Sequence, residues 1–514
     1  MSGNEDGQRG RHRPGAGRRN AAGRERNRPV NRSYTSAAPS ERTRRADPAR
    51  LVAFEVLRAV SSEDAYANLV LPVRIRQHRL DKRDAGFATE LAYGALRAQG
   101  TYDAILVKCV DRPLDQLDPA ILDALRLGAH QLLAMRVPAH AALDQTVGLA
   151  RAVIGAGPAS LINAVLRRVS SRDLADWTAQ LTAGSDPVAA AAIAQSHPEW
   201  IVRALRQALA GHGRSVEEIG QLLDADNAAP VVNLVALPGL GDLEEAFEAG
   251  AQPGGLVRDS ALYSGGDVGR LDSVRKGTTR VQDAGSQLVA RALAGAALRT
   301  EGPERWLDLC AGPGGKAALL AALAAEQGAT LLANEPAAHR AELVRQALRP
   351  VDHRVWEVRT GDGRDLGRLE PESFDRVLVD APCTGLGALR RRPESRWRRR
   401  PADVAQLAPL QRELLDSAIA AVKPGGLVAY VTCSPHIAET TAVVTDALRR
   451  HPEMEPGDSA AALDDASLTG DLQAGRAEGA GSTAQLWPHI HGTDAMFLSL
   501  LRKKTSAGAP AGKD

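Results

Sequence analysis

Three of the four cysteines of this chain lie in short motifs that could do chemistry together. Cys310 belongs to a glycine-rich run at residues 308–316, Cys383 ends the run Asp-Ala-Pro-Cys, and Cys433 lies in Thr-Cys-Ser about fifty residues further on. Each motif follows a hydrophobic, strand-like stretch. In an open α/β sheet, the carboxyl ends of the strands form the edge at which ligands bind. The sequence therefore predicts one site that contains three thiols.

The glycine-rich run predicts a loop that lets a ligand approach the backbone. The loop residues are Cys310, Ala311, Gly312, Pro313, Gly314, Gly315 and Lys316. Glycines allow a tight turn after a strand, and unpaired N–H groups at the start of the next helix favour anionic groups. The spacing does not match the G-x-G-x-x-G dinucleotide pattern, which argues against a dehydrogenase.

Two acidic residues at the ends of the following strands indicate the ligand. Glu335 lies about twenty residues after the loop, where a carboxylate can accept hydrogen bonds from ribose hydroxyls. Asp362 closes the third strand, where it could meet an adenine amino group. Either acid alone is more often a helix cap or a turn residue. At successive strand ends they indicate an adenosine-containing ligand without a pyrophosphate, and S-adenosylmethionine fits that description.

Two thiols and Asp380 at neighbouring strand ends suit the methylation of carbon 5 of cytosine. This carbon is too weak a nucleophile to take a methyl group directly, whereas a thiolate that adds to carbon 6 creates an enamine that can. An acid assists by a hydrogen bond or proton at N3, and a base must later remove the proton from carbon 5. A lone cysteine at a strand end is more often a small buried apolar residue. The chemistry alone leaves open whether Cys383 or Cys433 attacks.

These motifs lie in a region that alternates strands and helices from about residue 276. The expected strands cover residues 306–309, 330–334, 355–359, 376–379, 427–432 and 496–501. The expected helices cover residues 316–327, 337–348 and 408–422. Such alternation is typical of a doubly wound parallel sheet. Residues 456–483 are rich in Gly, Ala, Ser and Asp, and we expect them to form a mobile loop.

The first half of the chain predicts a separate all-α bundle. Residues 47–171 show helical periodicity and no convincing strand, and Asp118 followed by proline predicts the start of one helix. Residues 172–275 are expected to form a linker and a small α+β module. Residues 276–502 are expected to form the α/β domain, and residues 503–514 a polar tail.

Composition bounds the compartment and the partners. The 514 residues, 44% of them hydrophobic, can build several packed domains. Four cysteines cannot form a disulfide framework, and the chain shows neither an apolar signal segment nor the run of about 18 apolar residues needed to cross a membrane. We expect a reduced, cytoplasmic protein that binds neither a membrane nor a metal.

The N-terminal tail concentrates positive charge. Residues 1–50 hold 13 arginines and five acidic residues, although the whole chain has a net charge of only +2. Low apolar content predicts disorder over residues 1–46, and a tail of this kind commonly contacts nucleic acid through phosphates. A leader that only improves solubility is the alternative.

Residues 276–502 closely resemble the RNA cytosine-C5 methyltransferases of the NOL1/NOP2/Sun family. The resemblance lies in residues 281–287, 308–316, 361–365, 380–383 and 432–434. In the helical half, residues 83–88 and 161–168 resemble a fused domain similar to the antitermination factor NusB. The resemblance implies a multidomain protein: an all-α, NusB-like RNA-binding bundle, a small α+β linker module and a doubly wound, Rossmann-like methyltransferase domain.

The same resemblance implies roles for individual residues. Cys433 of the Thr-Cys motif would be the nucleophile, and Cys383 of the Pro-Cys motif would assist release of the methylated RNA. Asp380 would face the target base as well as the cofactor. The residues that would contact S-adenosylmethionine are 310–316, Glu335, Asp362 and Asp380.

The chain departs from the family pattern at three places. Gly312 stands where the family often has alanine, which we expect to be harmless. After the nucleophile the family usually reads Pro-Glu-Glu-Asn, whereas residues 436–440 keep a single acid, Glu439, to which we assign no role. Residues 494–497 replace an Asp-Gly-Phe-Phe-like run, which weakens any aromatic contact with RNA there.

A basic run after the Pro-Cys motif is the predicted RNA contact. It holds seven arginines between positions 390 and 400. The predicted contacts are Arg390, Arg391, Arg392, Arg396 and Trp397. Guanidinium groups can hold phosphates, and tryptophan can stack on a base or sugar. A solvated basic face without a partner is the alternative.

The resemblance predicts S-adenosylmethionine-dependent methylation of carbon 5 of a cytosine in 16S ribosomal RNA. Methylation of transfer RNA remains an alternative, because no residue encodes the substrate. A non-catalytic RNA-binding or assembly factor with a vestigial cofactor site is the alternative from another class. The intact residues Asp308, Lys316, Asp380, Cys383 and Cys433 argue against such decay.

Overall fold

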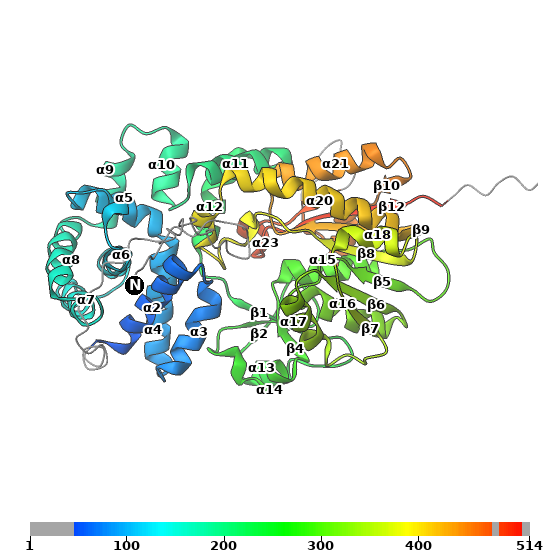
Figure 1. Ribbon diagram of the computed structural model, residues 1–514, viewed down its shortest axis with the longest axis horizontal. Coiled ribbons are helices and arrows are strands. Elements are labelled where there is room, and N and C mark those ends of the chain that lie inside the picture. Colours follow the sequence, from blue (N-terminus) through cyan, green and yellow to red (C-terminus); the bar gives the residue numbers. More distant parts are fainter. Residues whose placement is uncertain (1–45, 475–482, 506–514) are drawn as a thin grey trace, which may run out of the picture.

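A computed structural model describes residues 46–474 and 483–505 (Figure 1). In the view of Figure 1, a helical domain lies on the left, a small antiparallel module at the lower centre and an α/β domain on the right. The two predicted tails lie outside the described residues, apart from Ala46 and residues 503–505.

The helical domain confirms the predicted all-α bundle. Its helices are α2 (Pro48–Glu63), α3 (Ala67–Gln77), α4 (Lys82–Arg97), α5 (Gln99–Cys109), α6 (Pro119–Leu133), α7 (Ala139–Val153) and α8 (Ala156–Val169). Asp118 caps α6 as predicted, because its side chain accepts a hydrogen bond from the N–H of Ala120 and proline fills the first turn. The apolar faces of these helices meet in one shared core.

Four helices and a small sheet connect this bundle to the α/β domain. The helices are α9 (Leu174–Thr182), α10 (Pro187–Ala194), α11 (Glu199–Gly211) and α12 (Ile219–Asn227). The sheet has the order β2-β3-β1-β4 and is antiparallel throughout. Its elements are β1 (Val232–Ala236), α13 (Glu244–Glu248), β2 (Gln252–Pro253), β3 (Ser260–Tyr263), α14 (Asp272–Lys276) and β4 (Thr279–Val281).

The small sheet extends beyond residue 275, where the sequence placed its end. Strand β4 pairs with β1 and therefore belongs to this sheet. A strand of three residues is too short to show the alternation of apolar and polar side chains by which strands are recognised. Its membership is decided by pairing with a strand more than forty residues earlier in the chain.

The α/β domain is built on a mixed, mostly parallel sheet with the order β10-β12-β9-β8-β5-β6-β7. Its strands are β5 (Arg305–Asp308), β6 (Thr330–Glu335), β7 (Trp356–Thr360), β8 (Phe374–Asp380), β9 (Val422–Thr432), β10 (Met454–Pro456), β11 (Thr483–Gln485) and β12 (Phe497–Lys503). Its helices are α15 (Ala284–Gly295), α16 (Gly315–Glu326), α17 (Ala338–Leu348), α18 (Leu366–Leu369), α19 (Ser395–Arg398), α20 (Pro401–Ala421), α21 (Thr441–Arg450), α22 (Ser459–Ala466) and α23 (Pro488–His491).

The strand order creates a switch point next to β5. From β5 the chain continues outward through β6 and β7 on one side and returns to β8 and β9 on the other, and all these pairs are parallel. Strand β12 then runs antiparallel beside β9. Ligands of doubly wound sheets bind outside the carboxyl ends of strands at such a point. The predicted site therefore lies at the carboxyl edge of the sheet where the strand order reverses.

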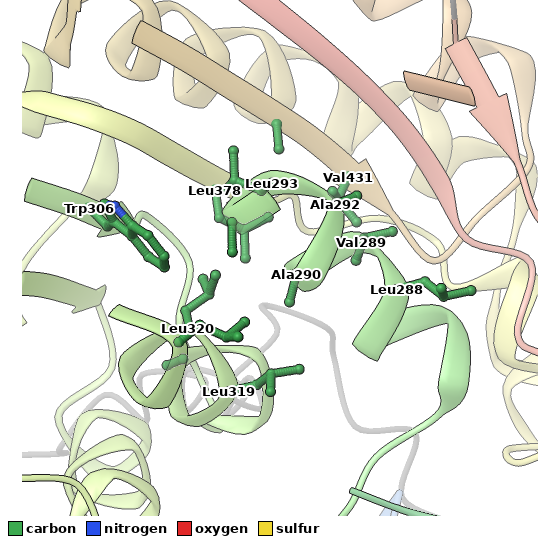
Figure 2. Packing of buried hydrophobic residues seen from close by; sticks show 14 of the residues in the cluster. Leu288, Val289, Ala290, Ala292, Leu293, Trp306, Leu319, Leu320, Leu378 and Val431 are labelled. Atoms are coloured by element: carbon green, nitrogen blue, oxygen red, sulfur yellow. The ribbon is translucent and has the colours of Figure 1, made fainter. Parts of the chain in front are cut away.

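Helices cover both faces of the sheet, because successive strand residues point to opposite sides. Trp306, Leu378 and Val431 pack with apolar residues of α15 and α16 on one face (Figure 2). Leu307 and Val377, each next to one of these in sequence, pack with α20 on the other face. This two-sided burial explains why the strands read as nearly continuous apolar runs.

Two predicted elements need correction. Helix α20 begins at Pro401 and contains Pro409, whereas the sequence favoured a start beside the second proline. Residues 456–483 are not one loop, because α22 lies within them and packs Ala460 and Leu463 into the core beside α15. Small residues, which read as loop-forming in isolation, allow this helix to approach its neighbour closely. Residues 475–482 lie outside the described part of the chain.

Candidate active site

The carboxyl edge of the sheet brings together residues from the ends of β5, β6, β8 and β9. The glycine-rich loop joins β5 to α16, and Gly314 there adopts a positive φ of 105° as the N-terminal cap of the helix. A Cβ atom at this position would lie 2.5 Å from the Cβ of Ala347 in α17. Glycine is therefore required both for the turn and for the close approach of α17 to the loop.

Glu335 is 1% exposed and lies directly against the loop. Its side chain accepts hydrogen bonds from the N–H groups of Gly312 (3.2 Å) and Ala337 (3.1 Å). Nη1 of Arg340 lies 3.4 Å from Oε1 of Glu335, and Nη2 of Arg340 donates to the carbonyl oxygen of Gly312 at 2.6 Å. An alanine at position 312 would place its Cβ 2.2 Å from Oε2 of Glu335 and 2.9 Å from Nε of Arg340, so the ends of these two side chains would have to shift to admit it.

Asp362 lies at the end of β7, beside Glu335: the N–H of Gly361 donates to the carbonyl oxygen of Glu335 at 3.3 Å. The carboxylate of Asp362 caps a short turn by accepting from the backbone N–H of Arg364, and it also accepts from Nε and Nη2 of the same residue; the side-chain hydrogen bonds lower the pKa of Asp362. Asp362 is partly exposed and keeps a charged carboxylate at the ligand edge.

Lys316 joins the loop to the end of β8. Its Nζ lies 2.8 Å from Oδ2 of Asp380. Burial alone disfavours the charged ammonium group, but Asp380 outweighs this and raises the pKa of Lys316. Asp308 is fully buried beside this pair, and neither of its side-chain oxygens has a hydrogen-bond partner in the described structure. Burial, assisted by Asp380, raises the pKa of Asp308 to about 7.

The unusual pKa of Asp308 predicts a pH dependence of stability. A folded-state pKa of about 7, against an ordinary value of 3.8, means that the contribution of Asp308 to the stability of the folded state is fully present below pH 3.8 and is lost as the pH rises from there through 7. The asparagine of Asp308→Asn cannot ionise. In the absence of cofactor, the melting temperature of this variant should therefore rise relative to that of the wild type as the pH increases from about 4 to 7. A constant difference from pH 4 to pH 8 would show that Asp308 titrates normally.

The two cysteines meet at the adjacent ends of β8 and β9. Their Sγ atoms are 3.5 Å apart, within the range of a thiol hydrogen bond. The hydrogen bond from Cys383 lowers the pKa of Cys433, and the ammonium of Lys316 acts in the same direction. The same contact, together with burial, raises the pKa of Cys383. The geometry therefore favours a thiolate at Cys433 and a thiol at Cys383.

Cys310, the third thiol of the predicted site, has a different environment. It is partly buried and packs against the apolar cluster under the sheet edge. Burial and the carboxylate of Asp308 raise the pKa of this thiol well above its usual range. Cys310 remains a packing residue of the loop, whereas the other two cysteines face each other.

The structure contradicts the RNA-contact prediction for Arg396, which is 0% exposed. The two terminal nitrogens of the guanidinium group donate within the protein, to carbonyl oxygens at the ends of α4, α10 and α12 and to one amide side chain, whereas Nε is buried without a partner in the described structure. The acceptors are the carbonyl oxygens of Arg97 (3.3 Å), Ser196 (3.0 Å) and Asp226 (3.2 Å) and the side-chain oxygen of Asn227 (2.8 Å). The last carbonyls of a helix lack partners within it, so this arginine satisfies groups that would otherwise be buried unpaired.

Other members of the basic run serve the same interface. Arg398 donates to three carbonyl oxygens at the end of α2, and Glu394 accepts from the N–H of Ala67 at the start of α3. Trp397 lies against Gly100 of α5, where an added Cβ would clash with its ring. The run is therefore mainly a connection between the helical domain and the α/β domain.

Arg390 is buried as well, which contradicts its predicted contact with RNA. It donates to Asp283 at 2.6 Å and to Asp494 at 3.1 Å. Arg391 also pairs with Asp494, but 41% of its side chain is exposed. Arg392 is exposed and lies over the ring of Tyr66 at 4.9 Å. Of the predicted set, Arg391 and Arg392 remain open to a partner, and Trp397 is half-buried.

Sequence reasoning missed two residues of this edge. Arg340 contacts both the loop and Glu335, and its place in the first turn of the helix after Glu335 was a usable signal. Glu439, left without a role, contacts the residue that follows each of the two facing cysteines. Its position six residues after Cys433 carries no signal, since the contact depends on a turn.

The described residues were also compared with the requirements for a metal site and for a membrane-spanning helix. No group of three or more His, Cys, Asp or Glu side chains within residues 46–474 and 483–505 is arranged to hold a metal ion. Over the same residues, none of the helices has the length and apolar character needed to cross a membrane.

Comparison with known families gives two matches. Residues 296–502 match the family described as 16S rRNA methyltransferase RsmB/F, and residues 47–171 match the NusB family. A provisionally named methyltransferase of Mycobacterium tuberculosis is 50% identical over 474 residues, which cover 92% of this chain and all of that protein.

A second relative, whose name states its substrate, matches nearly the same share of this chain. The ribosomal RNA small subunit methyltransferase B of Erwinia tasmaniensis is 31% identical over 88% of this chain and 98% of its own. Among solved structures, PH0851 aligns with a TM-score of 0.73 at 21% identity and covers 89% of this chain and 99% of its own. This last likeness shows that the whole arrangement of domains is a known fold.

Proposed function

Because this chain belongs to the 16S rRNA methyltransferase RsmB/F family, we propose that it transfers a methyl group from S-adenosylmethionine to carbon 5 of a cytosine in 16S ribosomal RNA. The observation that carries the chemistry is the pair of thiols 3.5 Å apart at the sheet edge, with opposite pKa shifts. A reaction with separate attack and release steps uses two such groups, whereas direct transfer to a nitrogen or oxygen needs neither.

The loop side of the site fits an adenosyl cofactor. Asp308 offers two buried acceptor oxygens without partners, which a ligand with an ammonium group could satisfy. Glu335 and Asp362 stand at successive strand ends, where carboxylates can accept from ribose hydroxyls and from the adenine amino group. Residues 310–316 would hold the ligand against their backbone. When bound, S-adenosylmethionine would supply an electrophilic methyl group.

The residues of this chain would then activate the cytosine. The thiolate of Cys433 adds to carbon 6, and the electron pair of the carbon 5–carbon 6 double bond becomes available at carbon 5. Lys316 helps to keep Cys433 ionised, because its ammonium group lowers the pKa of the thiol. Asp380, held by Lys316, is proposed to face the ring at N3, where it would deliver a proton as the addition places negative charge on the ring.

Release requires the reverse change after methylation. A base takes the proton from carbon 5, the double bond forms again, and the bond between Sγ of Cys433 and carbon 6 breaks. We assign assistance of this step to Cys383, whose raised pKa keeps it a proton-carrying thiol beside the departing sulfur. In this proposal the two cysteines have different roles because the pKa of Cys433 is lowered and that of Cys383 is raised.

Contacts with RNA are proposed at the exposed arginines of the same edge. Arg391 and Arg392 remain partly or fully exposed next to the Pro-Cys motif. The NusB-like bundle, which contacts the basic run through Arg398, is the proposed second RNA-binding surface. Binding through phosphates should weaken as salt concentration rises.

The direct test uses purified protein with methyl-labelled S-adenosylmethionine and ribosomal RNA from a strain that lacks the gene. We expect label in 16S RNA as 5-methylcytidine, identified by mass spectrometry and located by bisulfite sequencing. Label in transfer RNA alone would change the substrate assignment. Protein that retains no labelled cofactor and modifies no RNA would instead be an RNA-binding or assembly factor.

A further inference from the structure

Glu439 lies behind both cysteine motifs and touches neither sulfur. It closes the short turn Ile437–Glu439 that follows the Thr-Cys-Ser motif, and its side chain is 0% exposed. A fully buried carboxylate is costly unless hydrogen-bond donors surround it. The groups that donate hydrogen bonds to the Glu439 carboxylate therefore indicate its structural role.

The carboxylate links the residue after one cysteine to the residue after the other. Thr384, which follows Cys383, donates its backbone N–H to Oε1 at 2.8 Å and its hydroxyl to Oε2 at 2.5 Å. Ser434, which follows Cys433, donates its hydroxyl to the same Oε2 at 2.7 Å. One side chain thus holds the ends of β8 and β9 together directly beneath the two sulfur atoms.

The surrounding elements fix Glu439 itself. Gln411 of α20 donates to Oε1 at 3.3 Å and also to the carbonyl oxygen of Pro382 at 2.8 Å. The hydroxyl of Tyr430 in β9 donates to the backbone carbonyl of Glu439 at 2.9 Å. The carboxylate is therefore held between a helix and two strand ends, and its position leaves little freedom to the loops attached to it.

We propose that Glu439 is a positioning residue that holds Cys383 and Cys433 in the relative placement required for attack and release. The placement is a property of the folded protein, whereas its use in two steps rests on the proposed function. Cys433 must reach carbon 6 of the pyrimidine while Cys383 stays beside the sulfur of Cys433, so a shift between the loops separates the two groups. A displacement of about 1 Å can cost about 100-fold in rate.

Position and charge can be separated by two substitutions. Glu439→Ala removes every contact between the carboxylate and the two loops. Glu439→Gln removes the charge but can keep the contacts, because its oxygen can accept from the N–H of Thr384 while its NH2 group donates to the two hydroxyls, which also accept. A positioning role predicts that glutamine substitutes well and alanine poorly.

The first measurement reports on the sulfur atoms without any substrate. Phenylarsine oxide forms two As–S bonds with a pair of neighbouring thiols and releases one water. Wild-type protein should retain the arsenical against excess monothiol and release it to a dithiol, and Cys383→Ser and Cys433→Ser should each abolish retention. We expect Glu439→Ala to weaken retention at least about tenfold and Glu439→Gln to leave it near the wild-type level.

The second measurement is methyl transfer to RNA. Glu439→Ala should lower kcat by about 100-fold with little change in KM for S-adenosylmethionine, since the adenosyl side of the site is untouched. Glu439→Gln should restore most of the rate. Asp375→Asn is the matched control, a buried carboxylate at the opposite end of β8 that accepts from the backbone N–H of Arg305 and from Nζ of Lys423, each at 2.8 Å. It should lose stability without changing arsenical retention.

The outcomes separate this proposal from the proposed function. Retention by Glu439→Ala equal to that of the wild type would overturn the positioning role, whatever the RNA result. A wild-type protein that holds the arsenical but forms no 5-methylcytidine would overturn the proposed function alone. If Glu439→Ala does not fold, the double variant Thr384→Val and Ser434→Ala must weaken retention, and unchanged retention there would overturn the proposal.

Discussion

Replacement of Cys433 by alanine is expected to abolish methyl transfer and to leave no covalent protein–RNA species. Without addition at carbon 6, carbon 5 of cytosine stays too weak a nucleophile, and the rate should fall on the order of 10⁴-fold or more, the scale seen when a covalent nucleophile is removed. Folding should be nearly unchanged, because the side chain is only partly buried. The measurement is incorporation of labelled methyl groups together with denaturing gel analysis.

Replacement of Cys383 by alanine should have the opposite effect on the denaturing gel, where a covalent protein–RNA species should appear. Attack and methylation remain possible, but the adduct should resolve slowly and accumulate as a species that survives denaturation. Loss of the hydrogen bond from Cys383 should also raise the pKa of Cys433 toward its usual value, which shifts alkylation of that thiol to higher pH. Cofactor affinity provides the control and should match that of the wild type.

The reverse result would exchange the two roles. An adduct that accumulates with Cys433→Ala, and not with Cys383→Ala, would make the Pro-Cys cysteine the nucleophile, as in DNA cytosine methyltransferases. The asymmetry of the two thiols argues against this, because the same contact lowers the pKa of Cys433 and raises that of Cys383. Double replacement should remove both the activity and the adduct.

Arg396→Ala should destabilise the protein by about 3–5 kcal/mol, the range found when a buried hydrogen-bonded charge loses its partner. Its removal leaves carbonyl oxygens at the ends of several helices without donors and leaves the buried Asp226 without its nearest cation. Unfolding in urea measures the loss. The Michaelis constant for RNA should change little under conditions in which the variant remains folded.

Arg399→Ala is the matched control for this change. Arg399 belongs to the same basic run, but its side chain is 31% exposed and its nearest carboxylate, Asp403, lies 4.0 Å away. Its loss should cost less than about 1 kcal/mol. If Arg396→Ala unfolded like the wild type and only RNA binding weakened, the original expectation of an RNA contact would be restored and the buried interface would need revision.

Local sequence was sufficient for the parts of the fold that depend on neighbouring residues. The apolar runs of β5, β6 and β8 and the helices between them were predicted with boundaries a few residues from those observed. Asp118 marked the start of α6 because an N-cap is a local hydrogen bond. The carboxyl edge could also be predicted, since in a doubly wound sheet the ends of parallel strands meet on one side whatever the loops contain.

The sequence misled where a residue type has two common uses. A run of seven arginines with a tryptophan suits phosphates, and it equally suits unpaired carbonyls at helix ends. Arg396 contacts residues about 170 to 300 positions away in the chain, so nothing near it distinguishes the two uses. Only the packing of the helical domain against the α/β domain decides that this charge is buried.

Sequence by itself determined which chemical groups the protein possesses and the sheet edge at which they appear. It placed Cys383 and Cys433 at strand ends and Glu335 and Lys316 near a ligand loop. Only the tertiary structure decided how these groups affect one another. The 3.5 Å contact between the sulfurs, the opposite shifts of their pKa values and the link through Glu439 all join different strand ends. Distance and burial set these interactions, and both arise only when β8 and β9 lie side by side.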